Sequence, residues 1–323
     1  MKRYIIVGGA GFIGSHCAEE ILKTKENVAV VIYDNFSSGR MRHLEAIRSD
    51  RRLTIVTADA KDLKALSSAM KGSDVIYHFA SNPDISRAAR EPDIDFQEGT
   101  YLTNNVLEAA RLNGVKKIIY ASGSGVYGDA GHRITDEDYP YKNPVSTYGA
   151  SKLAGEALIS AYCHLFGMRG ASLRFANVVG PRQTHGVGYD FVKKLLRNKK
   201  RLEILGDGRQ SKSYIYIADV VSALMLLDRK MPKGFSCYNV ATRDYITVRE
   251  IAGIVAGVMG LTGVRYSYTG GSRGWKGDVP VVRLDTRKIR KMGWNNRYTC
   301  RQAVKKSIAA IYEDAKRNRS GTR

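Results

Sequence analysis

Two residues near the middle of the chain, Tyr148 and Lys152, have the types and the spacing of a proton-transfer pair. Residues four apart on a helix share one face, so the phenol and the ammonium would lie together. A free tyrosine has a pKa of about 10, and a nearby ammonium favours the phenolate. Lowering that pKa by ~3 units requires ~4 kcal/mol, which a partly dry site can supply. The spacing predicts that Tyr148 acts as a base, the alternative being an exposed helical pair.

A glycine-rich segment near the N-terminus predicts a second chemical feature, a turn that binds a dinucleotide. Gly8, Gly11 and Gly14 follow a strand-like run and open a helical pattern. The first glycine permits a tight turn, the second lets the backbone approach a pyrophosphate, and the third lets the helix pack closely on the strand. The strand–turn–helix context makes this motif far more specific than the glycines alone.

The type of dinucleotide depends on Asp34, which ends the next strand-like run. A carboxylate at this place accepts hydrogen bonds from a free ribose and repels a 2′-phosphate. This favours NAD over NADP, although Arg40 and Arg42 nearby keep NADP open. The alternative is that Asp34 is a simple turn residue.

The elements that must position these residues alternate between short apolar runs and helical patterns, which is typical of βαβ units. The predicted strands are 4–7, 28–33, 53–57, 75–79, 117–121 and 171–175, with helix-like segments at 14–23, 39–48, 62–70 and 100–112. We therefore expect an α/β fold, a Rossmann doubly wound parallel sheet with a smaller, interwoven α/β domain. Further helices are expected at 218–228, 248–259 and 303–315, and a strand at 237–240.

The expected domain division follows the point where this alternation breaks into glycine-rich loops after residue 175. Residues 1–175 should form the NAD-binding domain, with 214–241 returning to it, and residues 176–213 and 242–323 should form the substrate domain. The densest basic run, 193–201, is expected at the end of an amphipathic helix.

Composition and charge exclude several classes of protein. With 43% hydrophobic and 26% charged residues, the chain of 323 residues is neither a disordered segment nor a fibre nor a disulfide-rich miniprotein. It has no apolar stretch long enough to cross a bilayer and no cleavable leader, so we expect a cytoplasmic protein without a membrane partner. The four scattered cysteines predict reduced thiols and no metal site. The net charge of +21 would attract a polyanion or an anionic substrate, but we interpret it as a solvated surface without nucleic acid.

Further motifs complete a recognisable pattern. They are GGAGFIGSH at 8–16, DNFSSG at 34–39, Asp59-Ala60, HFA at 78–80, VYG at 126–128, RFANVVGPR at 174–182, LGDG at 205–208, and the segment from Arg273 to Asp278. With the Tyr148–Lys152 pair, they make the chain resemble an extended short-chain dehydrogenase/reductase of the NAD-dependent epimerase/dehydratase family, in particular its UDP-glucose 4-epimerases. The resemblance covers about residues 2–315.

The resemblance implies a role for each matching residue. Tyr148 would be the base, and Lys152 would hold the nicotinamide ribose. The cofactor-binding residues would be Gly8, Gly11, Phe12, Ile13, Gly14, Asp34, Asn35, Ser38, Gly39, Asp59, Ala60, Phe79, Ala80, Ser81, Ser122, Tyr148 and Lys152. The substrate-binding residues would be Ser124, Tyr148, Asn177, Lys212, Arg273 and Asp278. Lys212 stands where the family has arginine. The lysine keeps the positive charge but cannot bind a phosphate in the bidentate geometry of arginine.

Two positions depart from the family pattern. Gly123 occupies the place of the serine or threonine that contacts the sugar 4-oxygen, and Gly99 replaces an asparagine on the nicotinamide side. On a strand, Ser122 and Ser124 would point to the face opposite residue 123. A loop distortion at Gly123 and Gly125 could turn Ser124 inward, and we therefore place Ser124 with the catalytic residues.

The residues before Val126 also separate reaction types. Sugar 4,6-dehydratases need an acidic pair there, and this chain has Ser124 and Gly125. The expected activity is therefore reversible C4 epimerisation of a UDP-hexose, with N-acetylhexosamines as further substrates. The alternatives are another nucleotide-sugar enzyme such as a UDP-glucuronate 4-epimerase, or a non-catalytic protein of this fold that binds NAD and RNA. The resemblance also implies a homodimer formed through the helices at 100–112 and 148–165.

Overall fold

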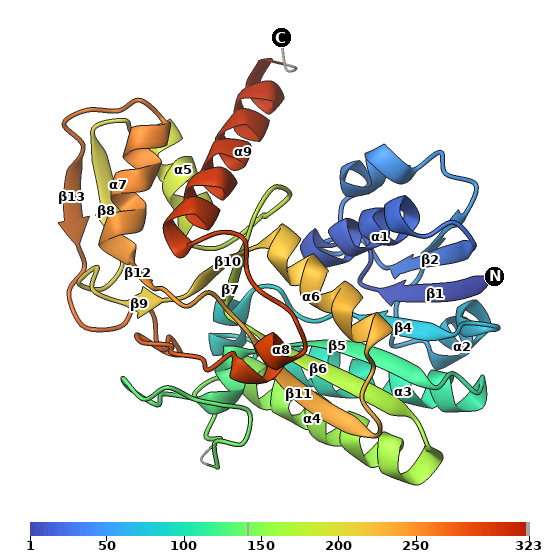
Figure 1. The fold of residues 1–323 in the computed structure, drawn as a ribbon. Helices are drawn as coiled ribbons and strands as arrows, with labels where there is room; N and C mark the ends of the chain where they lie inside the picture. The colour runs from blue at the N-terminus through green and yellow to red at the C-terminus, as the bar shows by residue number, and fades with distance from the viewer. Residues whose placement is uncertain (141, 321–323) are drawn as a thin grey trace. The chain divides into compact units, whose positions relative to one another are not determined.

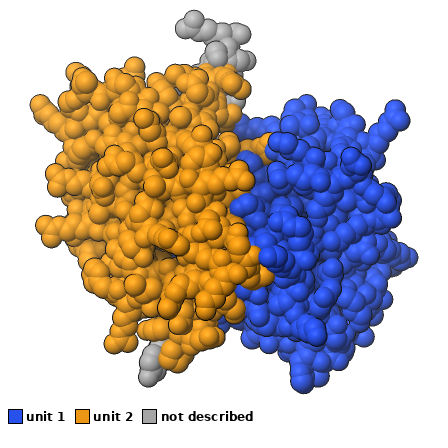
Figure 2. Space-filling view, viewed as in Figure 1, with its two compact units in different colours: residues 1–126, 146–174, 221–238 blue, residues 127–145, 175–220, 239–323 orange. Residues whose placement is uncertain are grey.

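The computed structural model describes residues 1–140 and 142–320, the last three of these by their backbone alone. The chain forms two compact units, each built from separate segments of the sequence (Figure 2). Unit 1 comprises Met1–Val126, Ser146–Arg174 and Val221–Tyr238, and unit 2 comprises Tyr127–Val145, Phe175–Val220 and Asn239–Arg323. Residues 141 and 321–323, which the expected domain limits included, lie outside the described residues.

A seven-stranded sheet in the order β11-β6-β5-β4-β1-β2-β3 forms the centre of unit 1 (Figure 1). The pairs β1–β2, β2–β3, β1–β4 and β4–β5 are parallel. Their buried runs of Val, Ile and Tyr fit a sheet that is covered on both faces. Helices α3 and α4 cover one face, and α1 covers the other. This confirms the predicted Rossmann fold.

The strands of the sheet are β1 (Lys2–Val7), β2 (Val28–Asp34), β3 (Leu53–Thr57), β4 (Val75–His78), β5 (Lys117–Gly123), β6 (Arg169–Phe175) and β11 (Phe235–Val240). The α-helices between them are α1 (Phe12–Thr24), α2 (Leu63–Met70), α3 (Leu102–Leu112), α4 (Thr147–Phe166) and α6 (Ile217–Arg229). Short turns of 3₁₀-helix are η1 (Met41–Ile47), η2 (Ile85–Ala89) and η4 (Ser124–Tyr127), and η3 (Phe96–Tyr101) is a π-helix.

Unit 2 is built around three mutually packed helices, α5 (Val187–Arg197), α7 (Val248–Val258) and α9 (Cys300–Ser320). Its remaining elements are β7 (Asn177–Val179), β8 (Arg201–Ile204), β9 (Ser211–Lys212), β10 (Tyr214–Tyr216), β12 (Ile246–Thr247), β13 (Arg265–Tyr268) and α8 (Arg287–Lys291). A capping box starts α7, because the side chains of Thr247 and Glu250 bond each other's backbone amides. Leu202 and Ile204 of β8 are fully buried in this core.

The segment 127–145 was expected in the first domain but belongs to unit 2. Hydrogen bonds to later parts of that unit explain why. The backbone amide of Thr135 donates to the carbonyl of Arg283 at 2.9 Å, and the amide of Asn239 donates to the Glu137 carboxylate at 2.7 Å. In the described part of the chain, no helix is both long and apolar enough to cross a bilayer.

Candidate active site

The start of α4 determines where the Tyr148–Lys152 pair lies. Ser146 caps this helix, since its hydroxyl accepts the backbone N–H of Gly149 at 3.1 Å. Tyr148 therefore lies in the first turn of α4, where the amide dipoles favour a negative charge. Lys152 follows one turn later on the same face, and its Nζ is 5.5 Å from the centre of the Tyr148 ring. The structure thus brings the predicted pair together.

Lys152 is the more deeply buried member of the pair, with 2% of its surface exposed. Its Nζ also lies 5.0 Å from the centre of the Tyr120 ring on β5. Burial lowers the pKa of Lys152 to about 7, although the carboxylates of Asp95 and Glu156 oppose this shift. A group with such a perturbed pKa beside a tyrosine is a candidate for a catalytic role.

Tyr148 is half-buried, and its pKa moves in the direction opposite to the one that base chemistry needs. Burial raises the pKa of Tyr148 to about 12, with a hydrogen bond from Ser81 opposing the rise and Asp95 adding to it. The ammonium of Lys152 alone therefore does not give the lowered pKa that the pair predicted. Further positive charge beside the hydroxyl is needed for the phenolate to form near neutral pH.

Glu156 continues the same face of α4 one turn beyond Lys152. It is 3% exposed and pairs with Arg174 on β6, whose Nη2 lies 2.6 Å from Glu156 Oε2. Ser172 donates to the same carboxylate at 3.0 Å. Burial tends to raise the pKa of Glu156, but Arg174 and the hydroxyls of Ser122 and Ser172 bring it below the usual value. Ser122, predicted as a cofactor contact, is thus buried beside Glu156.

Ser124 does not follow the strand alternation that was assumed for it. Strand β5 ends at Gly123, and Ser124 begins the 3₁₀ turn η4. Only Ser122 lies on the strand, so the backbone departs from the strand at Gly123, as the distortion expected at Gly123 and Gly125 requires. Ser124 is half-exposed at the end of the sheet.

Gly99, the other departure from the family pattern, lies in η3 where this π-helix packs on α4. A Cβ atom added at Gly99 would lie 2.6 Å from the Ser151 hydroxyl oxygen and 2.8 Å from its Cβ. Such distances are far below van der Waals contact, so no side chain fits at position 99 while Ser151 stays in place.

The glycine-rich turn has the geometry that a bound pyrophosphate requires. Gly8 has a φ of +81°, and a Cβ there would lie 2.5 Å from the backbone nitrogen of Ala80. A Cβ at Gly14 would lie 2.4 Å from the carbonyl oxygen of Gly8. The N-cap residue of α1, Gly11, supplies no side chain to the first-turn amides of the helix. These amides, which include those of Phe12 and Ile13, thus fit a phosphate of NAD.

Asp34 lies at the end of β2 and is 8% exposed. Its Oδ2 accepts the amide of Ala10 and its Oδ1 the amide of Phe36, both at 2.8 Å. The carboxylate therefore holds the glycine-rich turn against the loop after β2, which also requires Gly39 to have no side chain, because a Cβ there would lie 2.8 Å from Oδ1. Burial raises the pKa of Asp34, and the two backbone bonds oppose this. Asp34 is a turn residue with acceptor capacity left for a ribose hydroxyl.

Replacing Asp34 by serine should raise the affinity for NADP relative to NAD, because the charge that repels a 2′-phosphate is lost. The measurement is the Kd of each dinucleotide by titration. Asp62→Ser is a matched control, since Asp62 also accepts a backbone amide, that of Ala65 at 3.0 Å. The control should lose some stability and keep the NAD/NADP ratio. An unchanged NADP affinity in Asp34→Ser would remove Asp34 from the ribose site.

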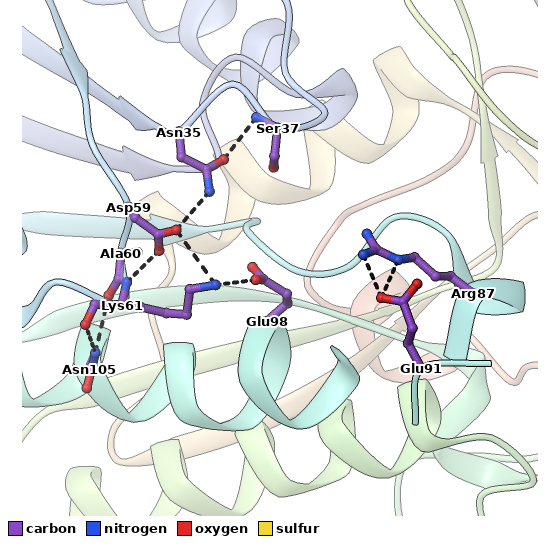
Figure 3. A network of polar contacts seen from close by, with 9 residues as sticks. All are labelled: Asn35, Ser37, Asp59, Ala60, Lys61, Arg87, Glu91, Glu98 and Asn105. Carbon is purple, nitrogen blue, oxygen red and sulfur yellow. Dashed lines mark hydrogen bonds and ion pairs between the residues drawn. The ribbon is translucent and has the colours of Figure 1, made fainter. Parts of the chain in front are cut away.

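The loops after β2 and β3 bring further predicted cofactor residues together (Figure 3). The Asn35 amide donates to Asp59 Oδ2 at 3.2 Å, and the backbone N–H of Lys61 donates to Asp59 Oδ1 at 2.8 Å. The Lys61 ammonium reaches across to Glu98 on η3, and this partner raises its pKa. Asn105 on α3 donates to the carbonyls of Ala60 and Lys61. The network fixes the loop after β3, which carries the predicted cofactor residues Asp59 and Ala60.

The remaining predicted cofactor residues lie along the edge of the sheet at the carboxyl ends of its strands. The amides of Phe79 and Ala80 donate to the carbonyl of Val7 at 2.8 and 3.0 Å, which ties the loop after β4 to the glycine-rich turn. Ser81 follows directly and bonds Tyr148. Ser38 is half-exposed in the loop that holds Asn35.

In unit 2, three of the four predicted substrate residues contact one another. Lys212 Nζ lies 2.6 Å from Asp278 Oδ1. Arg273 donates to the carbonyl of Asp278 and to the carboxylate of Asp129, each at 2.6 Å. The fourth residue, Asn177, is exposed at the start of β7, and its backbone N–H donates to the carbonyl of Ser213. Arg273 and Lys212 both contact Asp278, and a half-exposed guanidinium and an ammonium are groups that can bind an anion such as a diphosphate.

Several site residues escaped prediction because their roles depend on partners distant in sequence. Asp129 faces Arg273 across 144 positions, and Lys61 meets Glu98 across 37. Asp95 and Asn82 are likewise buried together beside Tyr148. Asp95 belongs to no sequence motif, and it stands out only by its burial, which the sequence does not show.

Comparison with known proteins places this geometry in context. The sequence profile of the NAD dependent epimerase/dehydratase family matches residues 4–241. A UDP-glucose 4-epimerase of Mycolicibacterium smegmatis is 32% identical, over 95% of this chain and 97% of that protein. A solved structure of a UDP-galactose 4-epimerase is 39% identical, with a TM-score of 0.86 over 97% of this chain and 99% of the other.

A relative with a different reaction is as similar in fold. A dTDP-glucose 4,6-dehydratase of Streptomyces venezuelae, solved with NAD bound, has a TM-score of 0.89 at 26% identity, over 97% of this chain and 98% of the other. The family match, the uncapped glycine-rich turn and the Tyr148–Lys152 pair all indicate the same family. The chain belongs to the NAD-dependent epimerase/dehydratase family, and its cofactor is NAD.

Proposed function

We propose that the protein is a UDP-hexose 4-epimerase, which interconverts the two configurations at C4 of the sugar. The observation that carries this proposal is an intact Tyr148–Lys152 pair next to a β5–η4 junction without acids. Residues 124 and 125 are serine and glycine, where 4,6-dehydratases need an acidic pair. The names of the relatives at 32% and 39% identity support the same reaction.

The predicted site residues of unit 1 have distinct tasks in this proposal. When bound, NAD supplies the acceptor and later the donor of the C4 hydride. Tyr148 takes the proton of the 4-hydroxyl and returns it when the configuration has been inverted. Lys152 holds the nicotinamide ribose and contributes positive charge beneath the phenol. Gly8, Gly11 and Gly14 hold the pyrophosphate, and Asp34 the adenosine ribose.

The second hydrogen bond to the sugar 4-oxygen is assigned to Ser124. Because η4 begins at Ser124, the alternation of side-chain directions along β5 does not apply to it. Glycines at 123 and 125 stand on either side, and Ser124 is half-exposed, which leaves room for a substrate to approach it. Ser124 thereby takes the place of the hydroxyl that is missing at position 123.

Unit 2 supplies the residues proposed to bind the nucleotide diphosphate. Arg273 offers a half-exposed guanidinium, and Lys212 adds an ammonium. Their present partners, Asp129 and Asp278, hold both cations in place within the unit. Asn177 and Asp278 complete the set as hydrogen-bonding groups. A substrate with two phosphate charges suits this arrangement.

The test is to purify the protein, identify its bound cofactor and follow UDP-glucose and UDP-galactose by chromatography. We expect bound NAD and equilibration of the two sugars without a net redox change. A thermal-shift screen of UDP-, dTDP- and GDP-sugars should give the largest Tm rise with UDP-sugars. Formation of a 4-keto-6-deoxy sugar would contradict the proposal. So would the absence of any conversion of UDP-sugars by protein that is loaded with NAD.

The substrate range should extend to N-acetylhexosamines. The family resemblance places the residue four after Asp278 at the border of the sugar pocket, and this residue is Val282, which is half-buried. A pocket that is merely wide cannot strongly reject the smaller sugar, so we expect less than ~100-fold discrimination in kcat/KM. Val282→Tyr should selectively lower kcat/KM for UDP-N-acetylgalactosamine. An unchanged ratio to UDP-galactose would contradict this; Val281→Tyr, on the neighbouring half-buried valine, is the control.

The protein should be a homodimer that pairs through α3 and α4. Leu112, Leu165 and Phe166 are 56%, 68% and 38% exposed on these helices. The stripe on α4 is completed by Ala154, Ala157, Leu158 and Ala161. Four helices, two from each copy, would bury this surface. Light scattering should give the dimer mass, and Leu165→Arg should give a monomer, while Ile134→Arg, 66% exposed in unit 2, should not. A monomeric wild type at micromolar concentration would contradict the prediction.

A further inference from the structure

A buried carboxylate close to the Tyr148–Lys152 pair has no task in the reaction described above. Asp95 is 1% exposed and directly precedes η3. Its Oδ1 accepts a hydrogen bond from Asn82 Nδ2 at 2.9 Å, and its Oδ2 accepts one from Thr147 Oγ1 at 2.7 Å. Both donors are neutral, and burying a charge without a cationic hydrogen-bonding partner is costly. The arrangement therefore points to a use for the charge other than stability.

The two partners of Asp95 are sequence neighbours of two site residues. Asn82 follows Ser81, which bonds the Tyr148 hydroxyl, and Thr147 precedes Tyr148 at the first position of α4. The loop after β4 and the first turn of α4 are thus joined twice, once by the Ser81–Tyr148 bond and once through Asp95. Asn82 is itself fixed, because it also bonds the backbone of Asp84 at 2.9 and 3.0 Å.

We propose that Asp95 is a positioning residue for the Tyr148–Lys152 pair, clamping the loop at Asn82 to the first turn of α4 at Thr147 and placing a fixed negative charge behind the pair. The proposal deepens the proposed function, because its effect on turnover rests on Tyr148 as the base. The clamp would keep the Tyr148 hydroxyl aligned with Ser81, and the charge would favour the ammonium form of Lys152.

The electrostatic part follows from the groups that face Lys152. These groups are Asp95 next to η3, Glu156 and Tyr148 on α4, Tyr120 on β5, and His78 on β4. His78 is neutral at physiological pH, because burial and the nearby Lys152 lower its pKa to about 3. Tyr120 is also neutral there, since burial raises its pKa. Among the described residues, the carboxylates of Asp95 and Glu156 therefore oppose the loss of the Lys152 proton. Glu156 is shared with Arg174.

Two substitutions separate the contact from the charge. Asp95→Asn removes the charge and keeps the shape, since its amide can donate to the Thr147 hydroxyl while its oxygen still accepts from Asn82. Thr147→Val removes the contact and keeps the charge, and Thr147→Ser restores the hydroxyl. Asp93→Asn is the matched control, because Asp93 is exposed two residues earlier in the same loop.

The experiment combines kinetics on the NAD-loaded protein with a titration that needs no substrate. The Lys152 signal in protein labelled with ¹³C at the lysine Cε is assigned by its loss in Lys152→Met, and its pKa is measured in each variant. We expect Asp95→Asn to shift the Lys152 titration and the alkaline limb of the kcat profile to lower pH. Thr147→Val should lower kcat about 10–100-fold with little change in KM and in the Lys152 titration, and Thr147→Ser should recover it.

Either of two results would overturn the proposal: a Lys152 titration that does not move in Asp95→Asn, or a Thr147→Val protein with the kcat of the wild type. If Asp95→Asn does not fold, the Thr147 pair of variants decides the matter, with rescue by serine as support and its failure as refutation. If the wild type proves inert toward every UDP-hexose, the Lys152 titration still decides the charge effect. Failure of the proposed reaction and failure of the Asp95 proposal are thereby distinguished.

Discussion

Tyr148→Phe should abolish turnover, lowering kcat by ~10²–10⁴-fold or more while NAD binding stays near normal. The substitution removes only the hydroxyl that is proposed to exchange a proton with the sugar, and the ring keeps its position in the first turn of α4. Measuring kcat and the Kd for NAD in the same preparation separates the two effects. A variant that retains most of its kcat would show that Tyr148 is not the base.

The matched control for this prediction lies on the same helix. Tyr162 also belongs to α4, and its hydroxyl donates to Glu108 at 3.2 Å, away from the Tyr148–Lys152 pair. Tyr162→Phe should therefore keep its turnover. The pH dependence adds a second check. Burial holds the pKa of Tyr148 high in the chain without cofactor, so the positive charge of the nicotinamide of bound NAD would have to lower it, and kcat should rise with pH as the phenolate forms.

Lys152→Met should cost most of the activity, weaken NAD binding and stabilise the fold. The loss of activity follows from the removed ammonium, and the weaker binding from the removed ribose contact. The gain in stability follows from burial, because the folded protein holds Lys152 with a pKa of about 7, well below its ordinary value of 10.5. Methionine fills a similar volume without a charge that must leave water.

The sign of this stability effect depends on pH in a defined way. Between pH 7 and about 10.5 the unfolded chain binds a proton at Lys152 that the folded chain does not. The stability of the wild type therefore rises with pH across this window. The Tm advantage of Lys152→Met should be largest at and below neutral pH and shrink toward pH 10. A Tm difference that is independent of pH, or an unchanged Kd for NAD, would contradict the role given to Lys152.

Much of unit 1 was predictable because its signals are local. The apolar run and the glycines at 8–14 specify the first strand, turn and helix, and the spacing of four between Tyr148 and Lys152 specifies one helix face. The helix-like segment at 39–48 was less well predicted, since the structure has a 3₁₀-helix at Met41–Ile47. Over only two turns, the spacing of apolar residues does not distinguish an α-helix from a 3₁₀-helix.

What could not be predicted depended on packing between distant segments. Helix α5 begins at Val187, inside the glycine-rich stretch that indicated a loop, because Gly186 with a φ of +94° serves as its N-cap. The direction of Ser124 depends on where β5 stops, which is a property of the sheet. The raised pKa of Tyr148 results from burial, which the spacing of the Tyr148–Lys152 motif does not predict.

The close approach at Gly99 has a consequence for how this sequence can change over time. The Ser151 hydroxyl oxygen would lie only 2.6 Å from the Cβ of any residue at position 99, so asparagine cannot replace Gly99 while its surroundings stay as they are. A shift of η3 or a prior loss of the Ser151 side chain has to come first. Because Ser151 lies between Tyr148 and Lys152, that first step passes through the turn that carries the chemistry. A substitution at position 99 is thereby coupled to one at position 151, and the two positions have to change together or in a fixed order.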